Sequence, residues 1–438
     1  MRPVPLLPLA IRRHAAARPL ALAVRDAAGD LSFGALDRAA DAAAAALRAS
    51  GVAPGDRVAL LAVPSGEAMA LLAGITRMGS VAVPLGTRLS RREIAVALEE
   101  TTPVLLIHDA DLADVTGGHG VPALAPADLL ARASGAPRQS VDVDPEAPAV
   151  AILTSGTTGR PKAALLSHRA LAASAAAWTA VLPPATGWLL CLGLAHVAGL
   201  GVAWRALGAG LPLHVIPGFD PEAVLAVLRS PAAPSHCSLV PVQLARLLEA
   251  AGEAAGEAAP PALRAVLLGG APIPPDLVRR ATAAGWPVIP TYGLTEAGSG
   301  VTALPADEAA ATPDSDGRPL PGVMLRIAEP GPDGVGEIQV RTPAAFSGYL
   351  SRDGATAAAF TADGWLRTGD LGRLAADARL FVVDRRGDLI VSGGENVYPA
   401  EVEAVLAAHP AIVEAGVAGR PDPTWGAVPV AGIVVRPG

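Results

Sequence analysis

The residues best suited to chemistry form a polar loop directly after an apolar stretch. Residues 154–162 read Thr-Ser-Gly-Thr-Thr-Gly-Arg-Pro-Lys. The glycines allow close backbone approach to a ligand, the hydroxyls and amides supply hydrogen-bond donors, and Lys162 adds a positive charge. This composition favours a phosphate-binding loop over a plain surface loop. The order differs from a Walker A loop, which requires G-x-x-x-x-G-K-[ST].

A second group of residues suits a nucleotide and its metal. Residues 292–296 read Tyr-Gly-Leu-Thr-Glu at the end of an expected strand. An aromatic face can stack on a purine, a hydroxyl can reach a phosphate, and a carboxylate can hold Mg²⁺. The earlier Gly-Gly-Ala at 269–271 leaves bare backbone against which a flat ring can lie. Taken alone, that glycine pair fits a tight turn equally well.

A third group supplies charged residues near the C-terminal end. Residues 364–370 read Gly-Trp-Leu-Arg-Thr-Gly-Asp, followed by Asp-Arg-Arg-Gly-Asp at 384–388. Asp370 suits ribose hydroxyls, and Arg385 suits a phosphate or ribose. Each of these charges, considered singly, also fits a solvated turn.

The elements that must position these residues alternate between Ala-rich helices and short apolar strands, which predicts parallel βαβ units in an α/β protein. Pro/Gly turns and short β-type runs follow, typical of a small antiparallel barrel. The predicted units are an N-terminal α/β subdomain at 1–150, a second α/β subdomain with the nucleotide site at 151–310, a β-barrel at 311–384, a hinge at 385–388, and the start of a small mobile α+β C-terminal domain at 389–438.

The composition of the chain limits the classes of partner and the cellular location that can be expected. The 438-residue chain has a formal net charge of −7 and no strongly basic cluster, which argues against nucleic acid. Cys191 and Cys237 lack metal-ligand spacing and are too few for a disulfide framework, so a cytoplasmic location is expected. The uncharged stretch between Arg169 and Arg205 contains Pro-Pro, several glycines and His196. That content predicts a buried strand, a Gly-rich loop and a buried helix, with no membrane span.

Together and in this order, the motifs resemble the adenylate-forming superfamily of acyl-CoA synthetases, peptide-synthetase adenylation domains and luciferases. The resemblance implies a ligase that uses ATP, Mg²⁺ and CoA. A carboxylic acid and MgATP give acyl-AMP and pyrophosphate, and a thiol then displaces AMP. The implied catalytic residues are Lys162, Thr295, Glu296 and His196, with Glu296 and Thr158 at the metal. The implied nucleotide-binding residues are Thr154, Ser155, Gly156, Thr157, Thr158, Gly159, Gly269, Gly270, Ala271, Thr291, Tyr292, Gly293, Asp370 and Arg385.

Residues 267–274, 285–296 and 392–399 are most similar to o-succinylbenzoate-CoA ligases of menaquinone synthesis. Benzoate-type, medium-chain and other acyl-CoA ligases remain alternatives, as does an enzyme that loads a carrier protein. Arg205 and Arg246 are the basic residues nearest to the expected acid pocket. The residues expected to line that pocket are His196, Gly199, Trp204, Ser238, Gln243, Gly270 and Ser299, with His236 as a further candidate. Trp204 is equally typical of plain core.

The chain departs from the superfamily pattern at Leu153, Ala163 and Ala195, and it has Gly387 at the implied hinge pivot. It contains no lysine after Lys162, although the superfamily has a C-terminal lysine that orients the carboxylate and α-phosphate. We therefore expect a truncated chain that ends within the mobile domain and adenylates weakly. A non-catalytic nucleotide-binding protein is the alternative from another functional class. A homodimer is left open.

Overall fold

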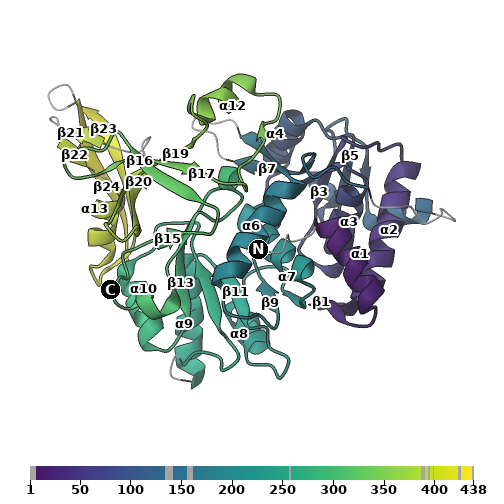
Figure 1. The fold of residues 1–438 in the computed structure, drawn as a ribbon, viewed down its shortest axis with the longest axis horizontal. Coiled ribbons are helices and arrows are strands. Elements are labelled where there is room, and N and C mark those ends of the chain that lie inside the picture. The colour runs from purple at the N-terminus through teal and green to yellow at the C-terminus, as the bar shows by residue number, and fades with distance from the viewer. Residues whose placement is uncertain are drawn as a thin grey trace.

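The computed structural model describes residues 6–133, 142–154, 161–255, 258–385, 390–392, 395–397, 399–422 and 426–436. The strands of these residues form two large mixed sheets and two smaller antiparallel sheets, and helices pack around them (Figure 1). The N-terminal helices, in purple, lie at the opposite end of the molecule from the C-terminal strands, in yellow. The predicted α/β class, with a small β unit and an α+β C-terminal unit, is confirmed.

The first large sheet has seven strands among the described residues. In spatial order they are β18 (Gly348–Tyr349), β8 (Lys162–Ser167), β7 (Pro148–Thr154), β4 (Val81–Pro84), β3 (Arg57–Leu61), β5 (Leu105–His108) and β6 (Ala123–Leu124). Its connecting helices are α2 (Phe33–Ala49), α3 (Gly66–Arg77), α4 (Arg91–Thr101) and α5 (Pro126–Leu130), with short 3-10 turns at Ala110–Val115 and Ala131–Ala133. Strands β4 and β5 bury every side chain, as parallel strands do when both faces are covered.

The second large sheet has nine strands among the described residues. In spatial order they are β15 (Arg318–Pro319), β14 (Thr302–Ala303), β13 (Val288–Tyr292), β12 (Ala265–Leu268), β11 (His236–Leu239), β9 (Trp188–Leu190), β10 (Leu213–Val215), β1 (Leu22–Asp26) and β2 (Gly29–Ser32). The helices of this region are α1 (Leu7–Ala17), α6 (His168–Val181), α7 (Val197–Ala209), α8 (Pro221–Leu228), α9 (Pro241–Ala255), α10 (Pro275–Ala283) and α11 (Ala306–Ala309).

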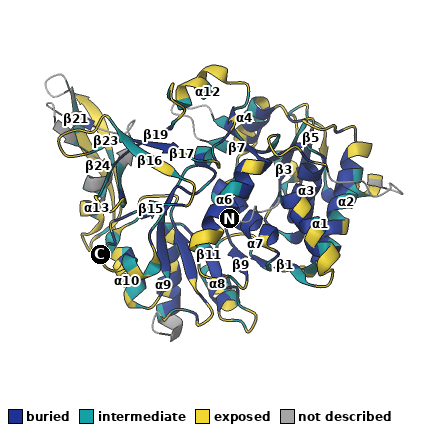
Figure 2. Cartoon of the chain, viewed as in Figure 1, coloured by how far each residue is buried: buried dark blue, intermediate teal, exposed yellow. Residues whose placement is uncertain are grey.

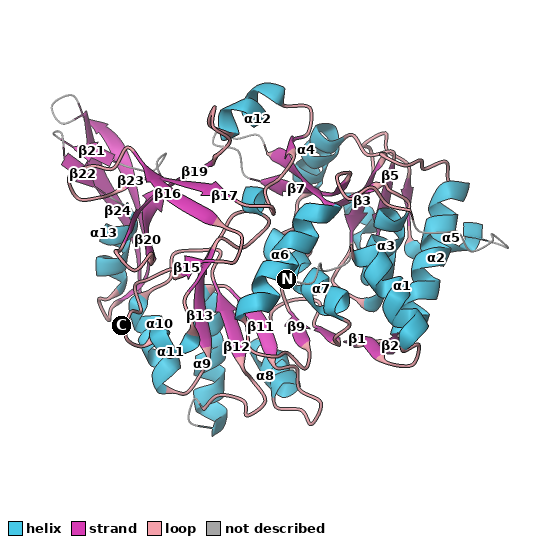
Figure 3. Cartoon of the chain, in the orientation of Figure 1, coloured by secondary structure: helices cyan, strands magenta, loops and turns pink. Residues whose placement is uncertain are grey.

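The two large sheets exchange strands across residue 150. Strands β1 and β2 precede that position but belong to the second sheet, whereas β8 and β18 follow it but belong to the first. Helices α6 and α7 lie between the sheets (Figure 3) and share one buried core with both. Within 169–205 the predicted buried strand is present as β9 and the predicted buried helix as α7, but the predicted Gly-rich loop is not, because Gly199 and Gly201 lie within α7. The domain boundaries proposed from the sequence stay a prediction.

Two smaller antiparallel sheets complete the described chain. The first consists of β16 (Met324–Ala328), β17 (Gly336–Arg341), β19 (Leu366–Leu374) and β20 (Leu380–Arg385), with α12 (Asp353–Ala359) between β18 and β19. The C-terminal one consists of β22 (Glu395–Val397), β21 (Ile390–Ser392), β24 (Gly426–Val435) and β23 (Ile412–Asp422), accompanied by α13 (Pro399–Ala407).

Small side chains allow this aromatic-poor chain to pack closely. A Cβ at Gly74 on α3 would lie 2.6 Å from the Cβ of Ala43 on α2, so these helices meet almost backbone to backbone. A buried ion pair at 2.7 Å between Arg77 and Asp37 joins the same two helices. Figure 2 shows the buried residues concentrated in the sheets and on the inward faces of the helices.

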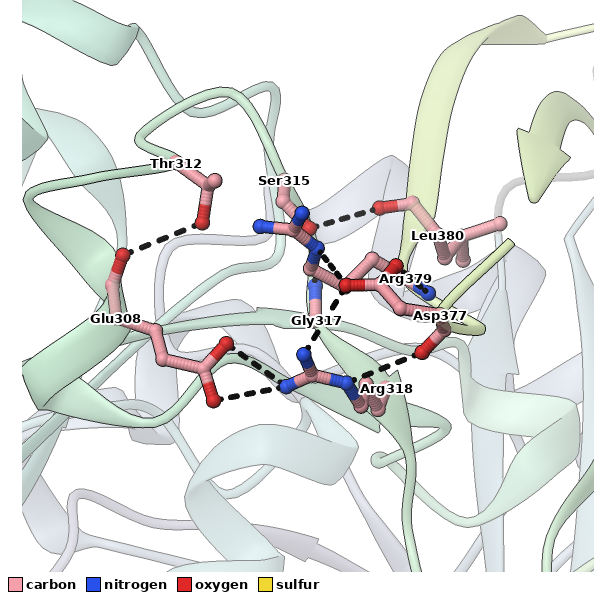
Figure 4. A network of polar contacts seen from close by, with 8 residues as sticks. All are labelled: Glu308, Thr312, Ser315, Gly317, Arg318, Asp377, Arg379 and Leu380. Carbon is pink, nitrogen blue, oxygen red and sulfur yellow. Dashed lines mark hydrogen bonds and ion pairs between the residues drawn. The ribbon is translucent and has the colours of Figure 1, made fainter. Parts of the chain in front are cut away.

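A polar network fixes the small sheet against the second large sheet (Figure 4). Arg318 on β15 donates hydrogen bonds to Glu308 at 2.8 and 2.9 Å and to Asp377 at 3.2 Å. The Ser315 hydroxyl donates to the carbonyl of Leu380 across 3.2 Å. The strand that carries Asp370 therefore has a defined position relative to the strand that carries Tyr292.

Candidate active site

The ends of the predicted phosphate loop are held together by an antiparallel strand pair. Thr154 ends β7, Lys162 begins β8, and the two residues pair in register. The Thr154 hydroxyl donates to the Lys162 carbonyl across 3.3 Å. The predicted loop residues Ser155, Gly156, Thr157, Thr158 and Gly159 lie outside the described residues, as does the predicted pivot Gly387. Their roles stay predictions.

A tyrosine that the sequence reading missed lies between two predicted catalytic residues. The Tyr349 hydroxyl donates a hydrogen bond to Glu296 Oε1 across 2.7 Å. The Lys162 ammonium nitrogen lies 5.2 Å from the centre of the Tyr349 ring, within cation–π range. Tyr349 is adjacent to Lys162 in space because β18 pairs with β8. No local motif marked it, since the pairing joins segments far apart in the sequence.

The second and third motifs meet directly. The Tyr292 hydroxyl donates to Asp370 Oδ2 across 2.7 Å, and both side chains are buried. Burial, with the nearby Asp370 charge, raises the pKa of Tyr292 well above its ordinary value, so the phenol keeps its proton. Arg385 pairs with Asp370 through the backbone of β20 and β19. Tyr292 and Asp370, which belong to separate motifs in the sequence, are thus in direct contact in the fold.

Glycines bring the expected adenine segment and the 291–300 segment into close contact. A Cβ at Gly269 would lie 2.4 Å from Thr291 Oγ1, and the Thr291 hydroxyl donates to the Leu268 carbonyl across 3.0 Å. A Cβ at Gly293 would lie 1.6 Å from the Ser299 carbonyl oxygen. These two positions need glycine because the facing groups are backbone or a fixed hydroxyl. Gly270 and Ala271 follow in the turn, and Thr295 lies in the 3-10 turn Thr295–Ala297.

Helix α7 and its N-cap carry three residues that are predicted to line the acid pocket, namely His196, Gly199 and Trp204. His196 is its N-cap residue, and a Cβ at Gly199 would lie 2.4 Å from the Gly193 carbonyl oxygen. Trp204 is 3% exposed, and its indole nitrogen has no hydrogen-bond partner among the described residues. The structure therefore places Trp204 in the core, which is the alternative interpretation of this residue given above. Its indole N–H donates no hydrogen bond among the described residues.

Two further candidates for the acid pocket already have partners. Gln243 accepts a hydrogen bond from the Val240 amide across 3.1 Å at the start of α9. His236 contacts the Ser235 hydroxyl at 2.8 Å through Nδ1 and the Pro183 carbonyl at 3.1 Å through Nε2. Burial lowers the pKa of His236 to about 4, so its ring is neutral near pH 7. Ser238 is partly buried on β11. Roles in substrate binding for Gln243, Ser238 and Ser299 stay predictions.

Arg205 on α7 is a buried cation beside aromatic rings. Its side chain is nearly inaccessible, and its Nε and Nη1 atoms have no hydrogen-bond partner among the described residues. The guanidinium carbon lies 4.8 Å from the centre of the Trp188 ring and 5.6 Å from that of Trp178. Burial lowers the pKa of Arg205 to about 9, which leaves it charged near pH 7. Such a charge is costly without a counter-ion, so the surroundings are suited to an anion.

The rings around Arg205 connect to the nucleotide motif. A Cβ at Gly300 would lie 2.4 Å from Trp178 Nε1, so the backbone of this segment lies against the indole. Gly300 follows Ser299, whose carbonyl touches Gly293. Trp178 and Trp188 were not selected from the sequence because lone tryptophans in Ala-rich stretches read as core. The available signal was Arg205, the single charged residue on an otherwise uncharged helix.

The described residues offer few ligands for the expected magnesium ion. Among the described residues, no group of three or more His, Cys, Asp or Glu side chains is arranged to hold a metal. Mg²⁺ bound with nucleotide takes one or two protein carboxylates and completes its shell with phosphates and water. A single oriented carboxylate, Glu296, fits that requirement.

Comparison with known proteins finds relatives that match most of the chain. A family model described as AMP-binding enzyme matches residues 11–350, and one described as AMP-binding enzyme C-terminal domain matches 401–438. A 2-succinylbenzoate–CoA ligase from Bacillus cytotoxicus is 38% identical over 370 residues, covering 82% of this chain and 74% of the relative. One from Bacillus mycoides is 37% identical over 366 residues, with the same shares of both chains.

Solved structures match the fold over nearly the full length. The o-succinylbenzoate CoA synthetase of Bacillus subtilis, in complex with its acyl-adenylate, superposes with a TM-score of 0.90 at 32% identity, covering 98% of this chain and 88% of that one. A fatty acyl CoA synthetase of Mycobacterium tuberculosis superposes with a TM-score of 0.83 at 29% identity and the same coverage. Within the described residues, no helix has the length and apolar content to cross a membrane.

Proposed function

Because the chain belongs to the AMP-binding enzyme family, we propose that it is an ATP-dependent 2-succinylbenzoate–CoA ligase. A carboxylate oxygen of the acid attacks the α-phosphorus of ATP, and the bond to pyrophosphate breaks to leave acyl-AMP. The sulfur of CoA then attacks the acyl carbon, forms the thioester and releases AMP. Solved relatives carry an acyl-adenylate, AMP, ATP with magnesium, or the product analogue OSB-NCoA, which supports ATP, Mg²⁺ and CoA as the cofactors.

Arg205 is the single observation that supports a dicarboxylic aromatic acid. When one carboxylate of 2-succinylbenzoate is activated, the other remains an anion close to an aromatic ring. Arg205 offers Nε and Nη1 without partners among the described residues, and Trp188 and Trp178 flank it. A guanidinium binds a carboxylate through paired N–H donors, and indole faces accept an aromatic ring. An acid with no second anion would leave this buried charge uncompensated.

The nucleotide residues act by orientation and charge. Lys162 neutralises phosphate charge, Asp370 accepts hydrogen bonds from ribose hydroxyls, and Tyr292 keeps Asp370 in place. Mg²⁺, when bound at Glu296, supplies further neutralisation of the phosphates. Little covalent chemistry falls to the protein, so positioning and electrostatic stabilisation at the α-phosphate account for the rate.

The experiment that tests this function is ATP–pyrophosphate exchange with three matched acids. They are 2-succinylbenzoate, 3-benzoylpropionate, which lacks the ring carboxylate, and 2-butanoylbenzoate, which lacks the side-chain carboxylate. We expect exchange with 2-succinylbenzoate to exceed that with either analogue by about 100-fold in kcat/KM, the scale of losing a charge-assisted pair. Equal exchange with 2-butanoylbenzoate, whose only carboxylate is on the ring, would favour a benzoate-type ligase. No exchange with any acid would favour a nucleotide-binding protein.

The acceptor and location complete the proposal. Adding CoA, pantetheine or a carrier protein to the preformed acyl-AMP distinguishes a CoA ligase from a carrier loader by the thioester that forms. A cytoplasmic location is supported by the two cysteines, Cys191 and Cys237, which are both buried and free.

A further inference from the structure

Tyr349 makes two contacts that use different parts of one side chain. Its hydroxyl donates to Glu296 Oε1 across 2.7 Å, and the centre of its ring lies 5.2 Å from the Lys162 ammonium nitrogen, which is over the ring face. Glu296 follows β13 of the second sheet, whereas Lys162 begins β8 of the first. One side chain therefore links the expected metal carboxylate to the expected phosphate cation, across the boundary between the two sheets.

The position of Tyr349 is fixed from several sides. Strand β18 pairs with β8, placing Tyr349 opposite Ala164, and the Tyr349 amide donates to the Thr356 hydroxyl across 2.8 Å. The Phe346 ring packs edge-on against the Tyr349 ring at 4.8 Å between centres. The Phe346 amide also donates to the Glu296 carbonyl across 2.8 Å. Backbone and ring contacts therefore hold both ends of the Tyr349–Glu296 hydrogen bond.

The direction of that hydrogen bond follows from protonation. The phenol of Tyr349 carries a hydrogen and an ionised carboxylate carries none, so the phenol donates and Glu296 accepts. A carboxylate can accept through each of its two oxygens. Because Oε1 of Glu296 accepts the hydrogen bond from Tyr349, Oε2 of Glu296 is left to bind a cation. Hydrogen bonds of this kind orient metal-ligating carboxylates and set their affinity for the metal.

We propose that Tyr349 is the positioning residue for MgATP, orienting Glu296 for the metal through its hydroxyl and Lys162 for the phosphates through its ring. This inference rests on the proposed function only in taking Lys162 and Glu296 as MgATP residues. The two halves of the side chain are separable, because Tyr349→Phe removes the hydroxyl and keeps the ring, whereas Tyr349→Leu removes both. Phe360→Leu is the matched control, since Phe360 stacks on Phe346 and lies outside the Lys162–Tyr349–Glu296 contacts.

The test is calorimetric binding of ATP to the 438-residue chain without any acid, at a series of Mg²⁺ concentrations. We expect Tyr349→Phe to raise the Mg²⁺ concentration for half-maximal ATP binding about 10-fold, the scale of one hydrogen bond to a charged group, with affinity recovered at saturating Mg²⁺. Tyr349→Leu should also weaken ATP binding at saturating Mg²⁺, about 5-fold, through loss of the cation–π contact. Phe360→Leu should leave the Mg²⁺ dependence within about two-fold of the parent, as expected for a residue outside the contact.

The opposite results would overturn the proposal. They are an unchanged Mg²⁺ dependence in Tyr349→Phe, or an equal shift in Phe360→Leu. A double-mutant cycle with Glu296→Gln adds a second check, because Tyr349→Phe should have no further effect once the carboxylate is gone. If Tyr349→Phe does not fold, Thr356→Val, which frees the Tyr349 amide, takes its place, and an unshifted Mg²⁺ dependence there contradicts the proposal. Since no acid is present, failure of the 2-succinylbenzoate assignment would leave these binding results interpretable.

Discussion

The Tyr292 hydroxyl donates a hydrogen bond to Asp370 Oδ2 across 2.7 Å, joining the end of β13 to β19 of the small antiparallel sheet. The two residues belong to separate motifs in the sequence. Their contact brings the candidate purine-stacking ring and the candidate ribose carboxylate to one place. The orientation of Asp370 therefore depends on Tyr292, which gives a direct way to test the nucleotide site.

Tyr292→Phe removes this hydrogen bond and keeps the aromatic ring. We expect the KM for ATP to rise about 10-fold, because a hydrogen bond to a charged group contributes about 1.5–3 kcal/mol. The preference for ATP over 3′-deoxy-ATP in pyrophosphate exchange should fall with it, as Asp370 loses its orientation. Asp370→Asn is the companion variant and should lower the same preference. A Tyr292→Phe protein that discriminates between the two nucleotides as the parent does would separate Tyr292 from ribose recognition.

Lys162 is the only lysine in the sequence, so its replacement removes the only ammonium side chain. We expect Lys162→Ala to lower kcat/KM for ATP by about 100-fold or more, the scale of losing a charged group at a developing phosphate charge. Lys162→Arg should recover part of that loss, because the charge returns but the planar fork does not reproduce a compact ammonium. Steady-state exchange at varied ATP measures both variants. Parent-like kinetics in Lys162→Ala would remove Lys162 from the phosphate site.

Arg205→Met should change stability and activity in opposite directions. Replacing a buried, uncompensated cation by an apolar side chain of similar length should raise the free energy of unfolding of the ligand-free protein by about 1–4 kcal/mol. The same change should lower kcat/KM for 2-succinylbenzoate far more than for 3-benzoylpropionate. Urea unfolding and pyrophosphate exchange supply the two measurements. A less stable variant with an unchanged ratio of the two acids would show that Arg205 serves the fold alone.

Asp316 should make stability depend on pH. Its partly buried carboxyl accepts a hydrogen bond from the Val382 amide across 2.8 Å, and burial raises its pKa to about 7. The unfolded chain releases this proton near pH 4, so the folded state binds the extra proton between about pH 4 and 7. The free energy of unfolding therefore falls as pH rises through that range and levels off above it.

Asp316→Asn should remove this decline while keeping an acceptor for Val382. We expect the variant and the parent to differ little near pH 4, and the variant to be more stable by about 1–2 kcal/mol at pH 8 after allowing for solvent screening. Urea unfolding at several pH values measures the difference. Asp307→Asn, which changes an exposed carboxylate on helix α11, is the control. A stability difference that is constant with pH would contradict the assignment to Asp316.

Much of the fold could be predicted from sequence because local patterns determine it. The predicted alternation of helices with short apolar strands is present, for example at β3, β5, β7 and β12, and β7 and β12 end where the motifs at 154–162 and 269–271 begin. Membership of the sheets could not be predicted, since β1, β2 and β18 join distant sheets through tertiary pairing. Strands of two to five residues carry too little periodicity to reveal such pairing.

The candidate site, like the fold, could be predicted only in part from the sequence. Lys162, Tyr292, Glu296 and Asp370 stand in recognisable motifs, and the structure brings Tyr292 to Asp370 and Lys162 close to Glu296 through Tyr349. Tyr349 itself could not be found, because its importance arises from the β18–β8 pairing. Arg205 was noticed only as a nearby basic residue. Its burial between two tryptophan rings, and therefore its unsatisfied charge, emerges only from the packed helices.

The measurement that tests the central claim most directly is ATP–pyrophosphate exchange by the 438-residue chain in the presence of 2-succinylbenzoate, compared between the parent and Arg205→Met. The account predicts that the parent exchanges pyrophosphate with 2-succinylbenzoate in preference to 3-benzoylpropionate and 2-butanoylbenzoate, and that Arg205→Met loses the preference over 3-benzoylpropionate. Mass spectrometry of the same mixture should detect the succinylbenzoyl adenylate. Parent exchange that is equal for all three acids, or a preference over 3-benzoylpropionate that survives in Arg205→Met, would contradict the account.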